Sequence, residues 1–321
     1  MRSRRLGPRA LALAALAGVV ATVGGTAMAT SLAPAAPAPK TGHVREYWVA
    51  AVPVTWNVVP NERNAIEGDT FTPPQTVFRT VVYRQYTKDF ARRVANAPGD
   101  EGIQGPLLQA DVGDTLLVHF RNLDTLTNSP HSMHFHGVHY RPGSDGAYLP
   151  GFSGPGANVK PGQSFTYRLE ARADSVGVWP YHDHSPSMDD SIAGGLFGAL
   201  SILGAGEQAP DHEYVVYLTS ELAFKTIDGR AFVGNTPVFK SKVGDLVQWD
   251  VLSLGDEHHT FHVHGHRWLD PDGTPRDTVT VGPAESFRIR WREEDPGTWF
   301  YHCHVEGHMM LGMIGIYRVS R

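Results

Sequence analysis

The chain has 321 residues, of which 41% are hydrophobic and 19% are charged, and its formal net charge is −5. This balance is ordinary for a globular protein and leaves room for two domains of common size. It excludes the strongly basic surface of a nucleic-acid-binding protein, and beyond the N-terminal region no apolar run is long enough to span a membrane. We therefore expect neither a nucleic-acid partner nor a stable membrane anchor.

The N-terminal residues have the organisation of an export signal. The basic pair Arg4-Arg5 precedes an apolar run over residues 11–23, and a small-residue cleavage signature follows. The arginine pair is similar to a twin-arginine signal, and the alternative is an ordinary secretory signal with a chance pair. We expect residues 1–29 to form the signal peptide, residues 30–42 to form an Ala/Pro-rich leader, and the mature protein to be secreted by the twin-arginine route.

The rest of the chain contains an internal repeat, since four sequence motifs recur in the same order. Residues 112–116, 134–137, 161–165 and 179–184 resemble, in turn, residues 243–247, 262–265, 283–287 and 299–304. Four matches in one order indicate a duplicated domain.

Each half of the repeat has the pattern of short strands. Residues 115–120, 164–169 and 286–291 alternate loosely between apolar and polar side chains, and turn-forming residues separate such segments. No segment shows a helical period, and 34 glycines and 23 prolines suit an all-β sandwich or barrel. The predicted boundaries are domain 1 at residues 43–203, a linker at residues 204–211 and domain 2 at residues 212–321.

Most of the 17 histidines fall in four clusters. The clusters are His134-x-His136, His182-x-His184, His259-x-x-His262-x-His264 and His302-Cys303-His304-x-x-x-His308. Because residues i and i+2 of a strand point to the same face, each His-x-His pair presents two imidazoles side by side. One such pair alone would be an ordinary surface or hydrogen-bonded pair. Four pairs at duplicated positions offer enough imidazoles for a three-metal cluster.

Cys303 is the only cysteine, and it lies between two of these histidines. An exported chain usually pairs its cysteines in disulfides, so a lone thiol indicates chemistry. In an extended chain Cys303 points to the face opposite its two histidine neighbours, which places a metal on the thiolate one residue away from metals on either of them. The remaining ligands are His259, His308 and Met313, and two His, one Cys and a weak axial Met make a blue-copper site.

A zinc site explains the pattern less well. Structural zinc takes four closed ligands, and catalytic zinc takes three ligands plus water. Neither kind of site uses this many imidazoles with a single thiolate.

The four clusters resemble the signature segments of the multicopper oxidases, and the two-repeat chain resembles the two-domain bacterial small laccases. The resemblance covers nearly the whole chain after the leader. It implies two cupredoxin domains in tandem and four coppers per protomer, namely one type 1 copper and a trinuclear cluster of one type 2 and two type 3 coppers. The implied ligands are His259, Cys303, His308 and Met313 for type 1 copper, His134 and His262 for type 2 copper, and His136, His182, His184, His264, His302 and His304 for the type 3 pair.

The repeat alignment explains why only domain 2 has a blue-copper site. Asp183 stands where Cys303 stands, and Met188 stands where His308 stands, so domain 1 has no soft thiolate. Copper nitrite reductases resemble the chain in size, but they carry the blue copper in domain one and lack a trinuclear set. Seven histidines, His131 among them, match no ligand position and are expected to be surface or hydrogen-bonded residues.

Two further residues have alternative interpretations. The small-laccase resemblance suggests that Tyr140 is a redox-active tyrosine beside the cluster, and the alternative is a packed aromatic side chain. Asp145 either relays protons to bound oxygen or forms a turn. With Cys303 and His308 for electron entry, these residues complete the set of candidate catalytic residues.

We expect a laccase-type oxidoreductase. A phenol or aromatic amine would give single electrons at the type 1 copper through His308, and four transfers would reduce O2 to two waters. The alternatives are a cuprous-ion oxidase, which seven methionines and no Met-rich insert disfavour, a protein like the copper nitrite reductases, and a copper store or electron carrier, which would not need the trinuclear set.

The expected assembly is a homotrimer. The trinuclear cluster needs His-x-His pairs from both domains, and a two-domain chain leaves ligand-bearing faces free at both ends. Such heterologous ends either close a ring or grow a filament, and three protomers would close a ring. The small-laccase resemblance implies the same trimer, with a trinuclear cluster at each subunit interface.

Overall fold

The structure is a computed structural model that describes residues 42–95, 97–98 and 102–321. The predicted signal peptide and residues 30–41 of the predicted leader lie outside the described residues, so both stay predictions. Within the described part of the chain, no helix is both long enough and apolar enough to cross a membrane.

The N-terminal half of the described chain consists of two sheets. Its strands are β1 (Val44–Asn57), β2 (Val77–Tyr86), β3 (Leu108–Asp111), β4 (Thr115–Asn122), β5 (His134–Phe135), β6 (His139–Tyr140), β7 (Ser164–Glu170), β8 (Gly177–His182) and β9 (Phe197–Leu203). One sheet has the order β2-β1-β4-β7-β6 and the other the order β3-β9-β8-β5. The pairs β1–β4 and β3–β9 are parallel, and the other pairs are antiparallel.

The C-terminal half repeats this plan. Its strands are β10 (His212–Glu221), β11 (Phe224–Ile227), β12 (Val238–Lys242), β13 (Leu246–Ser253), β14 (His259–Val263), β15 (Trp268–Leu269), β16 (Pro275–Arg276), β17 (Thr278–Val281), β18 (Ser286–Arg292), β19 (Gly297–Cys303) and β20 (Ile314–Ser320). The sheets have the orders β11-β10-β13-β18 and β12-β20-β19-β14-β17, with β15 and β16 as a separate ribbon. The parallel pairs β10–β13 and β12–β20 stand where β1–β4 and β3–β9 stand in the first half. Strand pairing therefore shows the duplication that the sequence motifs indicate.

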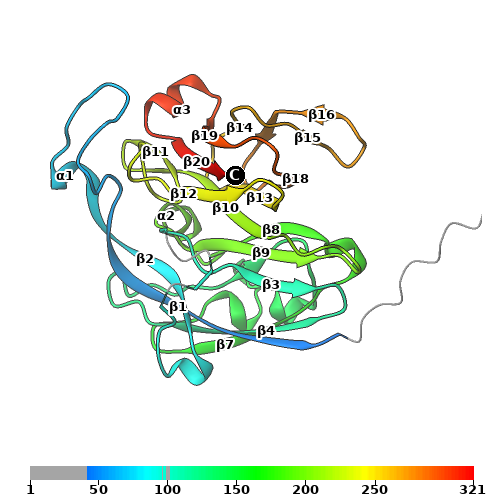
Figure 1. The fold of residues 1–321 in the computed structure, drawn as a ribbon. Helices are drawn as coiled ribbons and strands as arrows, with labels where there is room; N and C mark the ends of the chain where they lie inside the picture. Colours follow the sequence, from blue (N-terminus) through cyan, green and yellow to red (C-terminus); the bar gives the residue numbers. More distant parts are fainter. Residues whose placement is uncertain (1–41, 96, 99–101) are drawn as a thin grey trace, which may run out of the picture. The chain divides into compact units, whose positions relative to one another are not determined.

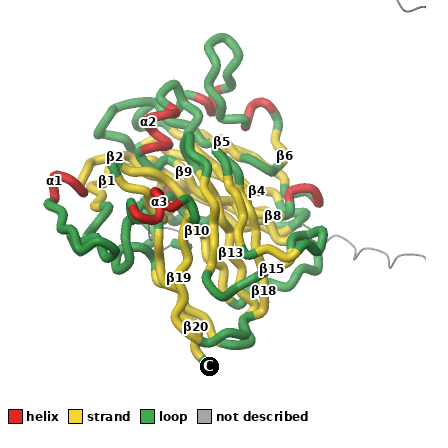
Figure 2. The backbone as a smooth tube through the Cα atoms, turned by 90° about the horizontal axis from the view of Figure 1, so that it is seen from above, coloured by secondary structure: helices red, strands yellow, loops and turns green. Residues whose placement is uncertain are grey.

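Helices are few and short among the described residues. They are α1 (Pro73–Thr76), α2 (Met188–Ala193) and α3 (Glu306–Met310), with 3-10 turns at Lys88–Phe90, Pro142–Ser144, Pro155–Ala157 and Ala173–Ser175. Figure 2 shows strands and connecting loops throughout the backbone, with only short helical segments. The prediction of an all-β chain is confirmed. Helices α2 and α3 lie at equivalent places in the two halves, directly after β8 and β19.

A buried tyrosine anchors each strand that carries a histidine pair at its end. Tyr181 of β8 is fully buried, and its hydroxyl donates a hydrogen bond of 2.6 Å to the carbonyl of Pro106. Tyr301 of β19 is equally buried, and its hydroxyl donates one of 2.7 Å to the carbonyl of Pro237. Each ring fills the core of its own half while its hydroxyl is satisfied, which ties β8 and β19 to the segments that lead into β3 and β12 of their own sheets.

The two halves meet along β8 and β9 on one side and β10, β13 and β18 on the other (Figure 1). Arg288 of β18 reaches across this contact. Its guanidinium donates hydrogen bonds to the Ile202 carbonyl at 2.8 Å and to Ser201 Oγ at 2.6 Å, and it pairs with Asp250 Oδ1 at 2.9 Å. A buried arginine that is paired and hydrogen-bonded in this way favours one arrangement of the two halves. The sheet that contains β9 and β8 is therefore held against the C-terminal half.

Candidate metal centres

The lone thiol lies with two imidazoles on one side of β19. Cys303 Sγ is 3.8 Å from His259 Nδ1 and 3.7 Å from His308 Nδ1, and the two Nδ1 atoms are 3.2 Å apart. Antiparallel pairing of β14 with β19 brings His259 beside the thiol, and the turn into α3 brings His308. Three donors of this kind that converge on one point are able to share a single metal ion.

Two of these donors, the thiol and His259, are shielded from water. Cys303 is fully buried, and burial raises the pKa of its thiol, whereas burial lowers the pKa of His259 to about 4. Both groups are therefore uncharged at neutral pH, and a bound cation would be needed to stabilise the thiolate. The Thr260 N–H points to the sulfur at 3.4 Å. Met313 is also fully buried, and its carbonyl accepts a hydrogen bond of 3.1 Å from the Cys303 N–H, which holds the two residues together.

The two neighbours of Cys303 face a different cluster. The rings of His302 and His304 lie with those of His262 and His264, at centroid separations between 5.1 and 5.7 Å. The Nε2 atoms of His264 and His302 are 3.0 Å apart. The structure thus places the thiol and the flanking imidazoles in two separate groups of donors, as alternation along a strand requires.

A second four-histidine cluster lies at the equivalent place in the N-terminal half. It consists of His134, His136, His182 and His184, with centroid separations between 5.2 and 5.7 Å. The Nε2 atoms of His136 and His182 are 3.2 Å apart. Burial lowers the pKa of both these residues to about 4, which keeps them in the neutral form that binds a metal. We call the two sets the N-terminal and the C-terminal histidine cluster.

Backbone carbonyls orient two histidines in each cluster, one from each His-x-His pair. His134 Nδ1 donates to the Asp145 carbonyl at 2.7 Å, and His262 Nδ1 donates to the Asp277 carbonyl at 2.6 Å. The rings of His182 and His302 each donate from Nδ1 to the carbonyl of the next residue, at 2.9 Å. A carbonyl only accepts, so these Nδ1 atoms carry the hydrogen and the Nε2 atoms are left free as metal donors.

A glycine follows the first histidine pair of each cluster, and the fold explains why. Gly137 and Gly265 have φ angles of +69° and +75°, and a Cβ at either would lie 1.9 Å from the ring of Trp179 or 2.8 Å from that of Trp299. Only glycine fits this backbone conformation under a tryptophan. The glycine of each His-x-His-Gly motif therefore packs directly against the tryptophan of the Trp motif in the same half.

The two histidine clusters do not meet within the chain. Among the described residues, no ring contact or hydrogen bond joins a histidine of one cluster to a histidine of the other. The N-terminal cluster instead opens into a cavity of about 620 Å³, whose other walls include Glu221, Glu257 and Ala284 of the C-terminal half. Each cluster thus provides four imidazoles, which is half the number that the predicted trinuclear site takes.

Tyr140 and Asp145 both lie beside His134. The ring of Tyr140 is 6.1 Å from that of His134, and Asp145 Oδ1 is 3.4 Å from His134 Nδ1. Burial, together with the charge of Asp145 and its hydrogen bond with Tyr140, raises the pKa of Tyr140 to about 12. Asp145 also ends the 3-10 turn at Pro142–Ser144, so its turn-forming role and its contact with His134 coexist. The proposed roles of both residues in catalysis stay predictions.

Sequence reasoning missed two residues. His131 is hydrogen-bonded, as expected, and it also has a place in the repeat. His131 stands three residues before His134, as His259 stands three residues before His262, and this spacing was the available signal. Asp277 was also missed, because its contact with His262 comes from pairing of β14 with β17 and no local motif indicates it.

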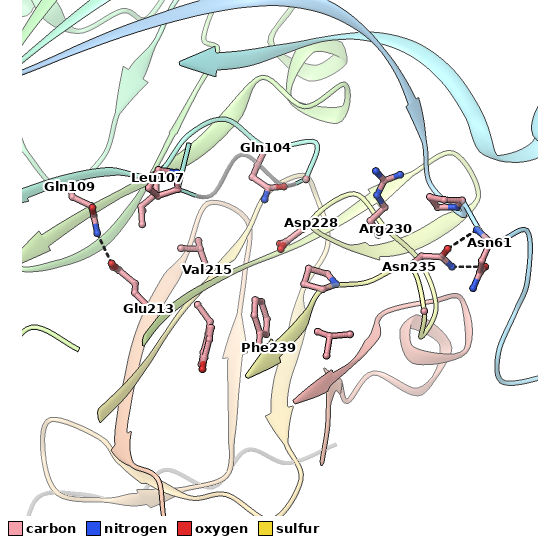
Figure 3. A pocket seen from close by; sticks show the side chains of 17 residues that line it. Asn61, Gln104, Leu107, Gln109, Glu213, Val215, Asp228, Arg230, Asn235 and Phe239 are labelled. Atoms are coloured by element: carbon pink, nitrogen blue, oxygen red, sulfur yellow. Dashed lines mark hydrogen bonds between the residues drawn. The ribbon is translucent and has the colours of Figure 1, made fainter. Parts of the chain in front are cut away.

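A larger cavity, of about 1010 Å³, lies away from the predicted ligands between residues of the two halves (Figure 3). Asn235 Nδ2 donates to Asn61 Oδ1 at 2.9 Å at one end, and Gln109 Nε2 donates to Glu213 Oε2 at 2.6 Å at the other. None of the predicted copper ligands is among the described residues that line it. Its size alone therefore does not identify it as the reaction site.

Comparison with protein families gives a consistent result. Residues 83–206 and residues 207–321 match two family models that are both described as multicopper oxidase. A solved structure of a multicopper oxidase has a TM-score of 0.66 with this chain, at 26% identity over 86% of this chain and 89% of that one. The matched regions together contain every predicted copper ligand.

Two curated relatives are much longer proteins. Ferroxidase HEPHL1 from Homo sapiens is 27% identical over 86% of this chain. A probable nitrite reductase-hydroxylamine oxidoreductase fusion protein from Kuenenia stuttgartiensis is 31% identical over 68% of this chain. The chain spans only 29% and 28% of their respective lengths.

The geometry around Cys303 generates a direct test. Cys303→Ser removes the soft donor but leaves the four imidazoles of the C-terminal histidine cluster in place on the other face of the strand. We expect the variant to show no intense blue absorption and to bind about one copper fewer per chain, because a blue-copper site needs the thiolate. Copper analysis and a visible spectrum measure this. A blue Cys303→Ser protein would show that the thiol is not a copper ligand.

Proposed function

Because the chain belongs to the multicopper oxidase family, we propose that it is a laccase-type enzyme, which oxidises phenols and aromatic amines and reduces O2 to water. The observation that carries the proposal is the position of Cys303 on β19. Its thiol lies with His259 and His308, while its two neighbours belong to a four-histidine cluster. The N-terminal sequence further supports the proposal that the enzyme is exported.

The donor sets fit copper. A buried thiol, two imidazoles and a neighbouring thioether suit type 1 copper, and groups made only of imidazoles suit type 2 and type 3 copper. We assign the type 1 site to His259, Cys303, His308 and Met313, the type 2 site to His134 and His262, and the type 3 pair to His136, His182, His184, His264, His302 and His304. When bound, the four coppers would accept electrons one at a time from the organic substrate. They would pass four electrons to each molecule of O2.

His308 is the residue that presents the type 1 site to a substrate. Its Nδ1 faces the thiol, and its side chain is 16% exposed. Val305 and Leu311 flank it in sequence and are 37% and 45% exposed. A flat aromatic ring would pack on this apolar rim against the edge of the imidazole. This surface supports an organic substrate.

Oxidation of a metal ion is the second candidate function. Glu257 Oε2 is 4.0 Å from His308 Nε2, and Asp256 and Asp189 line the same cavity as Glu257. Carboxylate oxygens of this kind hold divalent cations, and one relative is named a ferroxidase. However, the Lys225 ammonium lies 2.6 Å from Glu257 Oε1 and neutralises it. We therefore rank cuprous or ferrous ions below phenols as substrates.

The separation of the two histidine clusters supports a proposal about assembly. Each cluster provides four imidazoles, whereas the assigned trinuclear site takes eight. We propose a homotrimer in which the N-terminal cluster of one subunit faces the C-terminal cluster of the next, because unlike faces at the two ends of a chain close a ring. Metal binding across such an interface would add its free energy to that of assembly.

Tyr140 would act as an electron donor close to the assigned type 2 site. Its ring lies 6.1 Å from that of His134, and Asp145 is positioned to hold the phenol proton. Loss of an electron from a phenol requires loss of its proton as well, so a nearby carboxylate favours the step. We propose this role for the pair.

Oxygen uptake with different reductants tests the proposed function. A methoxyphenol should support rapid uptake, ferrous and cuprous ions should support slower uptake, and nitrite with a reduced donor should not be consumed. Glu257→Gln should leave phenol oxidation intact, because it removes only the carboxylate that approaches His308. Efficient oxidation of metal ions that Glu257→Gln abolishes, with little phenol oxidation, would make the second candidate the function instead.

Light scattering across a dilution series tests the assembly. Copper-loaded protein should remain trimeric at lower concentrations than protein stripped of copper with a chelator, since the metal bridges the interface. A fully loaded, active monomer would contradict the proposal, because it would show that the eight imidazoles meet within one chain.

The Tyr140→Phe variant tests the tyrosine. We expect an unchanged copper content, together with loss of a transient tyrosyl radical when the reduced enzyme meets O2, because phenylalanine has no hydroxyl proton to release. Electron paramagnetic resonance on rapidly frozen samples measures the radical. If Tyr140→Phe gives the same radical, Tyr140 is not its source and is only a packed aromatic side chain.

A further inference from the structure

The N-terminal half contains a buried polar cluster at the place where the C-terminal half has its thiol. The backbone shows the equivalence: the N–H of Asp183 donates to the carbonyl of Leu196 at 2.9 Å, as that of Cys303 donates to the carbonyl of Met313 at 3.1 Å. With the matching spacings on either side, four residues correspond to the assigned type 1 ligands. They are His131, Asp183, Met188 and Leu196, in place of His259, Cys303, His308 and Met313. One of the four donors is thus retained.

The retained histidine lies between two carboxylates. His131 Nδ1 is 3.1 Å from Asp183 Oδ2, and its Nε2 is 3.2 Å from Asp124 Oδ2. His131, Asp183 and Asp124 are all at most 3% exposed. Burial alone would lower the pKa of His131, but Asp183 and then Asp124 raise it above its usual value. The ring therefore bridges two buried carboxylates at the place where the other half would hold a metal.

Asp183 also joins two segments of the chain. Its Oδ1 accepts hydrogen bonds from the Ser132 N–H at 2.7 Å and the Ser185 N–H at 3.2 Å, and its Oδ2 accepts one of 2.8 Å from Ser185 Oγ. Ser132 Oγ in turn accepts the N–H of His184 at 3.0 Å. The segment leading into His134 is thereby fixed to the segment that carries His182 and His184.

We propose that Asp183 and His131 are positioning residues for the N-terminal histidine cluster. Their buried hydrogen-bonded pair takes the structural role that a type 1 copper would have in the other half, because it cross-links the two segments that bear the histidine pairs. Because this cross-link contains no metal, the N-terminal cluster is ordered before any copper binds. The inference rests on the proposed function, since it assumes that these histidines bind copper.

The replacement Asp183→Asn in the full-length protein tests the proposal. Asparagine keeps the size and one oxygen acceptor for Ser132 but removes the second carboxylate oxygen, which bonds His131. We expect the histidine-bound coppers to be held about 10–100-fold more weakly, which is the usual effect of losing a partner outside the ligand set. The blue absorption from Cys303 should be unchanged. Copper content against graded chelator and the type 2 electron paramagnetic resonance signal measure this.

Asp114→Asn is the matched control. Asp114 is a buried carboxylate of the same half, at 2% exposure, and it also joins segments, by accepting the His43 N–H at 2.8 Å and pairing with Arg45. It should lower stability without changing copper affinity. If Asp183→Asn does not fold, Ser185→Ala removes one hydrogen bond to Asp183 and should give a smaller loss of affinity in the same direction.

A double variant shows whether Asp183 acts through His131. His131→Phe alone should weaken copper binding, and its combination with Asp183→Asn should be no weaker than the worse single variant, because both changes break one unit. Wild-type copper affinity and an unaltered type 2 signal in Asp183→Asn would overturn the inference. A wild-type protein that binds only the blue copper would overturn the proposed function itself. This result is distinguishable from failure of the inference about Asp183, because it is seen without any variant.

Discussion

A residue in a strand points away from both of its neighbours, and in β19 this rule separates one thiol from two imidazoles. Cys303 turns toward His259 and His308, whereas His302 and His304 turn toward the C-terminal histidine cluster. A single residue of backbone therefore links two groups of metal donors. Pairing of β14 with β19, the turn into α3 and the buried anchor of Tyr301 all serve to hold that strand in register.

Burial sets the protonation state of these donors in the absence of a bound metal. It lowers the pKa of His136, His182 and His259 to about 4 and raises that of the Cys303 thiol, so each group is neutral at physiological pH. Neutral imidazoles need lose no proton to bind a metal, but the thiol does. The protein thus avoids burying several like charges together. Backbone carbonyls orient the rings through hydrogen bonds, without adding a charged group. The two kinds of site consequently differ in how strongly pH should oppose metal binding.

The two halves share one duplicated arrangement of strands, but they carry different residues at the position of the thiol. At the position of the thiol, the N-terminal half has a carboxylate that pairs with a buried histidine, and at the position of Met313 it has Leu196. The surrounding hydrogen bonds and the four-histidine cluster are kept. We infer that this position has a structural role that does not depend on a thiol. Such a role would explain how a half without a thiol still presents four imidazoles together.

The sequence by itself determined what depends on local period and on repetition. The all-β fold, the pairing of imidazoles on one face, the opposed direction of Cys303 and the resemblance to multicopper oxidases all follow from residues a few positions apart. The tertiary structure decided what depends on contacts between distant segments. Asp277 reaches His262 only because β14 pairs with β17, and His131 meets Asp183 only because the long stretch of chain between them folds back. The separation of the two histidine clusters is likewise a property of the tertiary structure. Burial, pKa and distance arise from packing between distant segments, and no local sequence pattern predicts them.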